Sequence, residues 1–545
     1  MNKNIILHTT LVSILVYIVY KINIQIPNYL DLLGSDDALY LKYGVEFNQH
    51  ITQEWAPAYN FWYYLLSKFT HNYIELYYLN IQVLYTISVF LFYIFLFQNY
   101  KNKYTAFVFA CLYSLQPILI GISPKISLFC IDSILITLVL CHLFKNKLHQ
   151  YMMFSVGMFW CWYARPEFSI AFIISLFIVF YFWYDILKKE KKANIDAITI
   201  YAICISIIVI TLKPLTFNKF SGMDKLYIAF VQHWGIYCTI TKNKIIGNST
   251  LYELYNKTLV DLFGPERTFI GIIKHQPLIV IKHIFVNILI SIKMLQKYTE
   301  GYVLPNLYFG WLKRINHIIF ISILVAFFYF NRKEIIINPK YWSIKSQTFG
   351  TFMVLFFFAV SIPIFLIGFQ EHYYLLFFLW FLIAVLYFIS TIKKVHKISK
   401  ALSLVIILLI IFNKPTLSKA KYSHTNPVDA MQLPNKVIYG YLQKNIPFSK
   451  HIIMIATEGG CEVYVNRPNI TVIPLLLVGF SDGKSIIESI NNYKAEYILV
   501  DKSLFIMSKN NIDNGMLKIL ENPYKYGFTK KIIFKNLKET YLLKR

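Results

Sequence analysis

Charged residues are scarce in this sequence. Asp, Glu, Lys and Arg make up 15% of its 545 residues, whereas about 25% is usual for soluble proteins. Acidic residues are the scarcest, with 28 Asp and Glu against 54 Lys and Arg, which gives a formal net charge of +26. Together with 57% hydrophobic residues, this composition excludes an ordinary soluble enzyme and indicates a chain that lies largely in lipid.

Motifs of several common chemistries are also missing. The sequence contains no Walker phosphate loop, no dinucleotide-binding glycine fingerprint and no HExxH pair, and its seven cysteines show no metal-ligand spacing. These absences argue against nucleotide-driven transport and zinc proteolysis. The lysines do not collect in one basic domain but separate apolar runs, so the composition does not favour a nucleic-acid partner.

Long apolar runs are what the sequence has instead. A helix needs about 20 residues to cross a hydrocarbon core about 30 Å thick. The run lengths predict eleven membrane spans, at 5–20, 76–97, 104–122, 126–144, 151–164, 168–185, 195–212, 315–330, 349–368, 373–392 and 401–412. The first is expected to be a retained signal anchor, because no small-residue cleavage site follows it.

The lysine-rich connections predict the orientation of these spans. With the amino terminus in the cytoplasm, every such connection falls on the cytoplasmic side, as the positive-inside rule requires. An odd number of spans then places the carboxyl terminus outside. The apolar segment 277–295 carries Lys282, His283 and Lys293, and it is expected to lie in the outer interface or to form a re-entrant helix.

This topology gives two predicted domains. Residues 1–412 form a transmembrane domain with long outer loops at 21–75 and 213–314. Residues 413–545 form an extracytoplasmic domain, which we expect to be a small α/β fold. Short stretches predict strands at 451–456, 470–474, 497–501, 531–534 and 540–543, and the polar segments between them predict helices or turns.

An adjacent pair of carboxylates, Asp36 and Asp37, stands in the first outer loop, close to the membrane surface. Either carboxylate could serve as a general base toward a hydroxyl while its neighbour binds substrate or a divalent cation. Alternatively, Ser35 or Asp36 caps a helix that begins near Ala38. The pair alone does not decide between these interpretations.

The surrounding residues resemble a known class. Asp-Asp-Ala-Leu-Tyr at 36–40 and Pro-Ala-Tyr at 57–59 are similar, in order and spacing, to motifs of the GT-C polytopic glycosyltransferases, in the group of protein mannosyltransferases and aminoarabinose transferases. The resemblance implies Asp36 as the catalytic carboxylate, with Asp37 beside it, and Tyr40 and Tyr59 as substrate-binding residues.

Further candidates follow from the resemblance. Arg165 and Glu167, in an Arg-Pro-Glu element between two spans, would shape the sugar or phosphate pocket, or else anchor the helix end in the interface. Asp132, near the start of the fourth span, would bind acceptor or hold a divalent cation with Asp37. Lys125 lies nearby, either for phosphate or as a solvated anchor.

The remaining candidates lie at other helix ends. His372 and Tyr373 open the tenth span, where the family often carries Arg-Tyr, so His372 would replace an arginine that faces the donor phosphate. Lys213 is another candidate for that phosphate. Gln232 and His233, in the second outer loop, are weaker candidates for pocket residues.

The sequence therefore predicts an inverting glycosyltransferase in a bacterial inner membrane. Its donor would be a polyprenyl-phosphate sugar, and its acceptor a lipid, a glycan or a protein on the extracytoplasmic face. A transporter or flippase of lipid-linked glycans, or a polymerase, is the alternative. A transporter should show matching interrupted spans in two halves or charges at mid-bilayer, and neither pattern is evident.

Overall fold

The computed structural model describes most of residues 3–214, part of 219–234, residues 263–298, 346–366, 371–390 and several positions up to 407, and most of 433–545. Short gaps interrupt these ranges. The predicted span at 315–330, most of the one at 401–412, and Gln232 and His233 lie outside the described residues.

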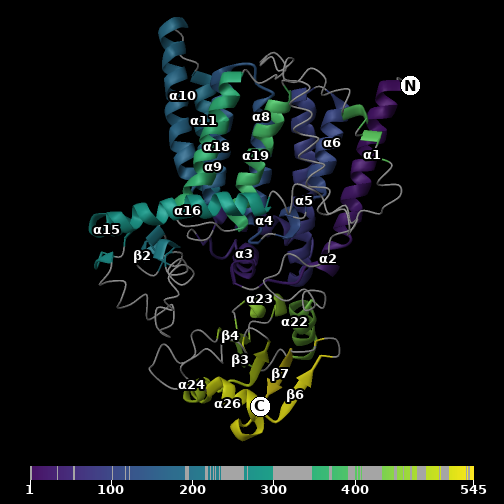
Figure 1. The fold of residues 1–545 in the computed structure, drawn as a ribbon, viewed down its shortest axis with the longest axis vertical. Helices are drawn as coiled ribbons and strands as arrows, with labels where there is room; N and C mark the ends of the chain where they lie inside the picture. The colour runs from purple at the N-terminus through teal and green to yellow at the C-terminus, as the bar shows by residue number, and fades with distance from the viewer. Residues whose placement is uncertain are drawn as a thin grey trace.

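A bundle of helices forms the larger part of the molecule (Figure 1). In lipid a helix satisfies all of its own backbone hydrogen bonds, so apolar runs of this length fold as helices. The bundle contains α1 (Lys3–Asn23), α5 (Tyr73–Tyr100), α6 (Lys103–Ser114), α8 (Ile126–Cys141), α9 (Lys147–Ala164), α10 (Phe168–Glu190), α11 (Ile195–Leu212), α18 (Ser346–Leu366) and α19 (Glu371–Ser390).

Among the described residues, five helices are long and apolar enough to cross a membrane, or six if one bent pair is counted as a span. The five segments are Ile5–Tyr29, Tyr73–Asn99, Phe168–Lys189, Ile195–Leu212 and Thr348–Leu366. Two shorter apolar helices, Ile126–Cys141 and His372–Ala384, accompany them. The chain thus has the helices of a polytopic membrane protein, and the predicted count of eleven spans stays a prediction.

One predicted span is wrong in its extent. The sequence predicts an unbroken run over 104–122, but α6 ends at Ser114 and a separate short helix, α7 (Ile118–Gly121), follows. The cause is Gln116, which precedes a proline. A residue before proline disfavours helical geometry, and proline itself cannot donate the next helical hydrogen bond.

Two short helices lie across one end of the bundle, opposite the amino terminus of α1 (Figure 1). They are α3 (Ser35–Val45) and α4 (Pro57–Leu66), and we call this end the loop end. A third short helix, α2 (Ile26–Tyr29), leads toward α3 from α1. Helices α3 and α4 approach closely at Gly44, where an added Cβ would lie 2.2 Å from Cβ of Tyr63, so any larger residue would force the helices apart.

Helix α16 (Pro277–Tyr298) runs across the loop end rather than along the bundle (Figure 1). It meets α15 (Phe269–His275) at an angle of 112°. One face packs inward with Val280, His283 and Asn287 buried. The opposite face carries exposed large apolar side chains, namely Leu278, Ile281, Phe285 and Leu289. A helix with this division of faces is typical of a membrane interface, where the sequence predicts this segment to lie.

We expect an apolar diazirine dissolved in lipid bilayers to label the exposed face of α16 when activated by light. Adducts should map to Leu278, Ile281, Phe285 and Leu289, because the interface would place these side chains among acyl chains. Ile533, equally apolar and 69% exposed in the C-terminal sheet, is the internal control. Labelling of Ile533 but not of α16 would contradict the interfacial position.

Residues 433–545 contain a five-stranded sheet, which we call the C-terminal α/β region. Its strands are β3 (Ile452–Ala456), β4 (Ile470–Pro474), β5 (Tyr497–Val500), β6 (Lys530–Ile533) and β7 (Tyr541–Lys544). Each agrees with a predicted strand within a residue at either end. The order is β4-β3-β5-β7-β6, with β3 parallel to β4 and β5, and β7 antiparallel to β5 and β6.

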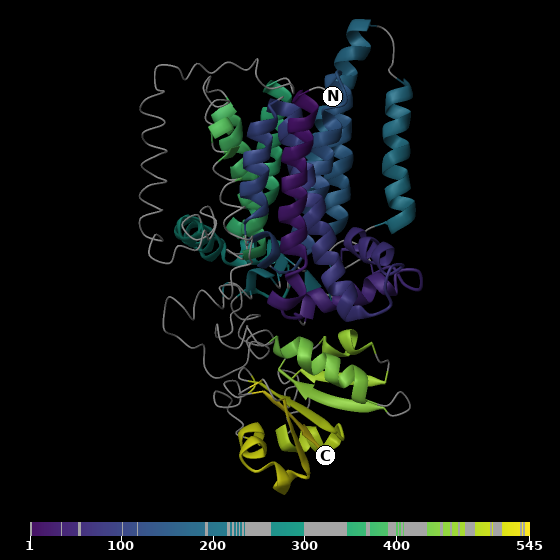
Figure 2. The same ribbon diagram turned by 90° about the vertical axis from the view of Figure 1, so that its right-hand side faces the viewer.

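The helices of this region fall on two sides of the sheet. In chain order, the described helices are α22 (Pro434–Asn445), α23 (Cys461–Val465), α24 (Ile486–Asn492), α26 (Gly515–Glu521) and the 3-10 helix η5 (Pro523–Tyr526). Helices α22 and α23 lie between the sheet and the loop end of the bundle, whereas α24 and α26 lie on the far side (Figures 1 and 2). A buried hydrophobic cluster continues from the bundle into this region.

Candidate functional site

Helix α3 sends its two adjacent carboxylates into different environments. Asp36 is exposed in the first turn, whereas Asp37 is only 2% exposed. Successive helical residues point about 100° apart, so a helix lying on a surface exposes one of two neighbours and buries the other. Of the pair, Asp36 is the carboxylate that an incoming molecule can reach.

Asp37 is fixed by the loop that precedes α8. Its Oδ1 accepts the backbone N–H of Lys125 at 3.0 Å, and its Oδ2 accepts a hydrogen bond from Oγ of Ser123. Burial raises the pKa of Asp37, and the charge of Lys125 partly offsets this. Asp37 therefore ties α3 to the start of α8.

Lys125 is buried as deeply as Asp37. It is 1% exposed, and its Nζ donates to the backbone carbonyl of Ile120. Burial lowers the pKa of Lys125 to about 8, against the opposing effect of Asp37. The predicted alternative, a solvated lysine anchor, is therefore wrong, because the ammonium group has no access to bulk water.

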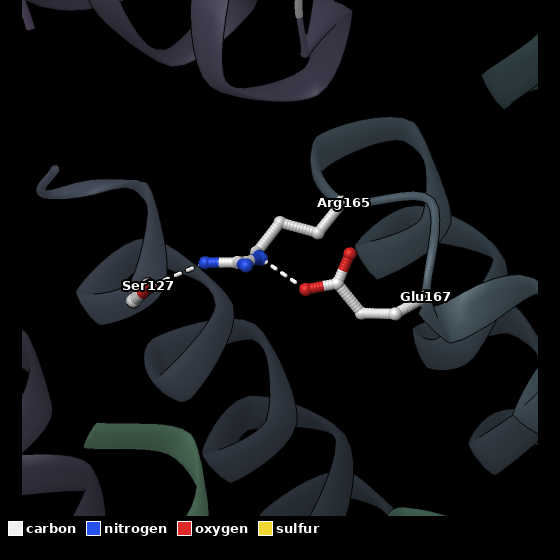
Figure 3. A network of polar contacts seen from close by, with 3 residues as sticks. All are labelled: Ser127, Arg165 and Glu167. Atoms are coloured by element: carbon white, nitrogen blue, oxygen red, sulfur yellow. Dashed lines mark hydrogen bonds and ion pairs between the residues drawn. The ribbon is translucent and has the colours of Figure 1, made fainter. Parts of the chain in front are cut away.

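An ion pair of Arg165 and Glu167 lies at the turn between α9 and α10 (Figure 3). The side chains are 7% and 9% exposed. Arg165 Nε donates to Glu167, and its Nη1 donates to Oγ of Ser127 in α8 at 2.6 Å. The guanidinium also lies 4.7 Å from the ring centroid of Tyr373 in α19. The turn between α9 and α10 and two further helices, α8 and α19, thus meet at one cation.

The acidic helix and this cation belong to one electrostatic cluster. The pKa of Tyr40 is raised by burial first and by the charge of Asp36 second, with Arg165 acting in the opposite direction. Asp36 and Arg165 both act on Tyr373 as well. Tyr40 and Tyr373 are therefore both within range of the charges of Asp36 and Arg165, and Arg165 contacts Tyr373 directly.

Tyr59 has a packing role. It is fully buried, its ring lies 5.4 Å from that of Tyr40, and its hydroxyl accepts a hydrogen bond from Asn80 at 2.8 Å. Asn80 also donates to Tyr63 at 3.0 Å and accepts from Trp62 at 2.9 Å. Direct contact of Tyr59 with a substrate, which the resemblance implies, does not fit this position.

Asp132 is buried in the bundle, near Ser88 and Tyr113. By hydrogen-bond geometry neither of its carboxylate oxygens has a partner. Asp132 stands seven positions after Lys125, whose backbone N–H binds Asp37, and this offset corresponds to about 10 Å along the helix axis. Among the described residues no group of three or more His, Cys, Asp or Glu could hold a metal ion, and a cation site made by Asp37 and Asp132 stays a prediction.

The two remaining phosphate candidates differ. Lys213 is exposed after the end of α11. His372 lies beside Tyr373, with ring centroids 4.2 Å apart, and hence one residue from the ring that stacks on Arg165. The geometry therefore favours Arg165 and His372 over Lys213.

Sequence reasoning missed three polar residues that build the site. Ser123 and Ser127 hold Asp37 and Arg165, and Asn80 holds the tyrosines of α4. Only Asn80 left a signal, as an amide inside a predicted apolar span, where an unpaired polar group is costly. Serines near helix ends are too common to be singled out.

We expect Arg165→Lys to destabilise the protein by about 1.5–3 kcal/mol, the usual worth of a hydrogen bond to a charged group. A lysine ammonium cannot bind Glu167, reach Ser127 and lie flat against Tyr373 at once. Thermal unfolding in detergent measures the change, with Lys189→Arg as a control, since Lys189 makes an exposed pair with Asp185. An unchanged midpoint for Arg165→Lys would contradict the assigned contacts.

No protein-family model matches the chain, and comparison with curated proteins finds no match. The site is therefore interpreted from its own residues and from the resemblance of its motifs.

Proposed function

We propose that this protein is a membrane glycosyltransferase that uses a polyprenyl-phosphate sugar as donor. The observation that supports the proposal is that the charges of an exposed carboxylate, Asp36, and of a buried cation, Arg165, both act on Tyr40 and on Tyr373, the ring that Arg165 contacts. Transfer of a sugar from a phosphate needs both a base for the acceptor hydroxyl and positive charge for the leaving phosphate.

The proposed reaction is a single displacement. Asp36 accepts the proton of the acceptor hydroxyl while that oxygen attacks the anomeric carbon. The bond from this carbon to the phosphate oxygen breaks, and polyprenyl phosphate leaves with the bonding electrons. Because the oxygen attacks from the side opposite the leaving group, the configuration at the anomeric carbon inverts.

The leaving phosphate would contact Arg165 and His372 at the loop end of the bundle. Charge that develops on a leaving group is stabilised best by donors already held in place, and Arg165 is held by Glu167, Ser127 and Tyr373. The exposed apolar surfaces of the bundle would hold the polyprenyl chain in lipid beside this end.

Transfer of radiolabelled sugar by the purified protein in lipid tests the proposal. A panel of polyprenyl-phosphate sugars would be supplied with lipid, glycan and peptide acceptors, with and without divalent cations. Label on an acceptor or in released sugar supports a transferase and identifies its donor. Donor binding without turnover under every condition would favour the alternative, a transporter or flippase of lipid-linked glycans.

A further inference from the structure

Helix α22 of the C-terminal α/β region receives its amino-terminal cap from the bundle. Leu433 occupies the N-cap position, but its apolar side chain cannot accept hydrogen bonds from the free backbone N–H groups of the first helical turn. Asp31, which lies 404 residues earlier, accepts the N–H of Asn435 at 3.0 Å with Oδ2 and that of Lys436 at 2.8 Å with Oδ1. These are the donors that a capping side chain ordinarily satisfies from within its own helix.

The next two residues of the same loop are held as well. Asn435 Nδ2 donates to the carbonyl of Leu32 at 2.7 Å, and the hydroxyl of Tyr464 in α23 donates to the carbonyl of Leu33 at 2.6 Å. Asp31 to Leu33 are the last described residues before α3 begins. Three consecutive residues leading to the acidic pair are therefore each bound by the C-terminal α/β region.

Tyr464 is a rigid part of this contact. It is fully buried, its ring stacks on Tyr439 at 5.7 Å, and it meets Tyr77 of α5 edge-on at 5.6 Å. Its electrostatic partners include Asp37. An aromatic side chain with two rotatable bonds that is packed against two other rings holds its hydroxyl at one position.

Asp31 has the charge that such a cap requires. Burial raises its pKa to about 6, while hydrogen bonds from Asn435, Lys436 and Leu32 lower it in part. At pH 7.5 the side chain is therefore an anion, and an anion at a helix amino terminus is favoured by the helix dipole as well as by the hydrogen bonds.

We propose that the C-terminal α/β region is a clamp that holds α3 in position, with Asp31 and Tyr464 as its positioning residues. That the clamp thereby sets the place of the Asp36 carboxylate for transfer rests on the function proposed above. The clamp concerns only the position of α3 and can therefore be tested without any substrate.

Hydrogen exchange of the full-length protein in lipid nanodiscs at pH 7.5 tests the clamp. Tyr464→Phe keeps the ring and removes one donor, so amides in residues 35–45 should exchange about two- to tenfold faster, the range set by one hydrogen bond. Tyr524→Phe is the matched control, because Tyr524 is 71% exposed on the far side of the sheet. Asp31→Ala should speed exchange at the start of α22 by about three- to thirtyfold, as loss of a cap does.

A transfer assay separates the clamp from the proposed function. If the protein is a transferase, Tyr464→Phe should lower kcat and leave the KM for donor unchanged, since Tyr464 meets no substrate. Faster exchange in α3 without any transfer by the wild type would remove the proposed function and keep the clamp. Unchanged exchange of α3 in Tyr464→Phe would overturn the clamp, whatever the transfer assay gives.

Discussion

Asp36→Asn is expected to lower the turnover of sugar transfer by about 10²–10⁴-fold, the usual contribution of a general base. Asparagine has nearly the same size as aspartate but cannot take a proton from the acceptor hydroxyl. Because Asp36 is exposed in the first turn of α3, the substitution should leave the thermal midpoint and the elution of the purified protein in detergent unchanged. Initial rates at saturating donor and acceptor measure the effect.

Asp185→Asn is the matched control for this experiment. Asp185 is a partly exposed carboxylate that pairs with Lys189 near the carboxyl end of α10. The Asp185→Asn variant should transfer sugar at the wild-type rate. Turnover of Asp36→Asn within threefold of wild type would remove Asp36 as the base.

Asp37→Ala should destabilise the fold and lower the free energy of unfolding by about 3–5 kcal/mol, which is typical when a buried charge loses its partner. The substitution removes the acceptor of the Ser123 hydroxyl and of the Lys125 backbone N–H. It also leaves the ammonium group of Lys125 buried without the opposite charge of Asp37. The thermal midpoint in detergent and the yield of monodisperse protein report the loss.

Asp185→Ala provides the comparison for stability, because exposed ion pairs contribute about 0–1 kcal/mol. The double variant Asp37→Ala with Lys125→Met tests the cause. If the buried ammonium accounts for most of the loss, replacing it with an apolar side chain should recover part of the stability. A double variant less stable than Asp37→Ala alone would mean that Lys125 stabilises the site independently of Asp37.

Most of the described helices and strands could be predicted from the sequence. Short apolar stretches between polar segments placed all five strands of the C-terminal α/β region within a residue, because a short apolar run bounded by polar residues favours a buried strand. Hydropathy located the bundle helices, because apolar runs of this length are local features of the sequence. It ran through Gln116, however, since an average over a window is insensitive to a single residue before proline.

The roles within the site could not be read from the sequence. Asp36 and Asp37 are neighbours of the same type, and only the packing of α3 on the bundle decides which one is buried. Asp132 illustrates another limit, because its position inside an apolar run predicts that it needs a partner but does not say which residues surround it, and the structure buries it near Ser88 and Tyr113. Distances between elements depend on tertiary contacts that no local pattern encodes.

The cap that Asp31 gives to α22 also has a consequence for biogenesis. Asp31 and Asn435 are separated by 404 residues, and chains are synthesised at about 5–20 residues per second, so Asp31 leaves the ribosome roughly 20–80 s before Asn435. During that interval the loop before α3 has none of these partners. A nascent chain can therefore insert its bundle early, while the segment that carries the acidic pair reaches its final position only when synthesis is almost complete.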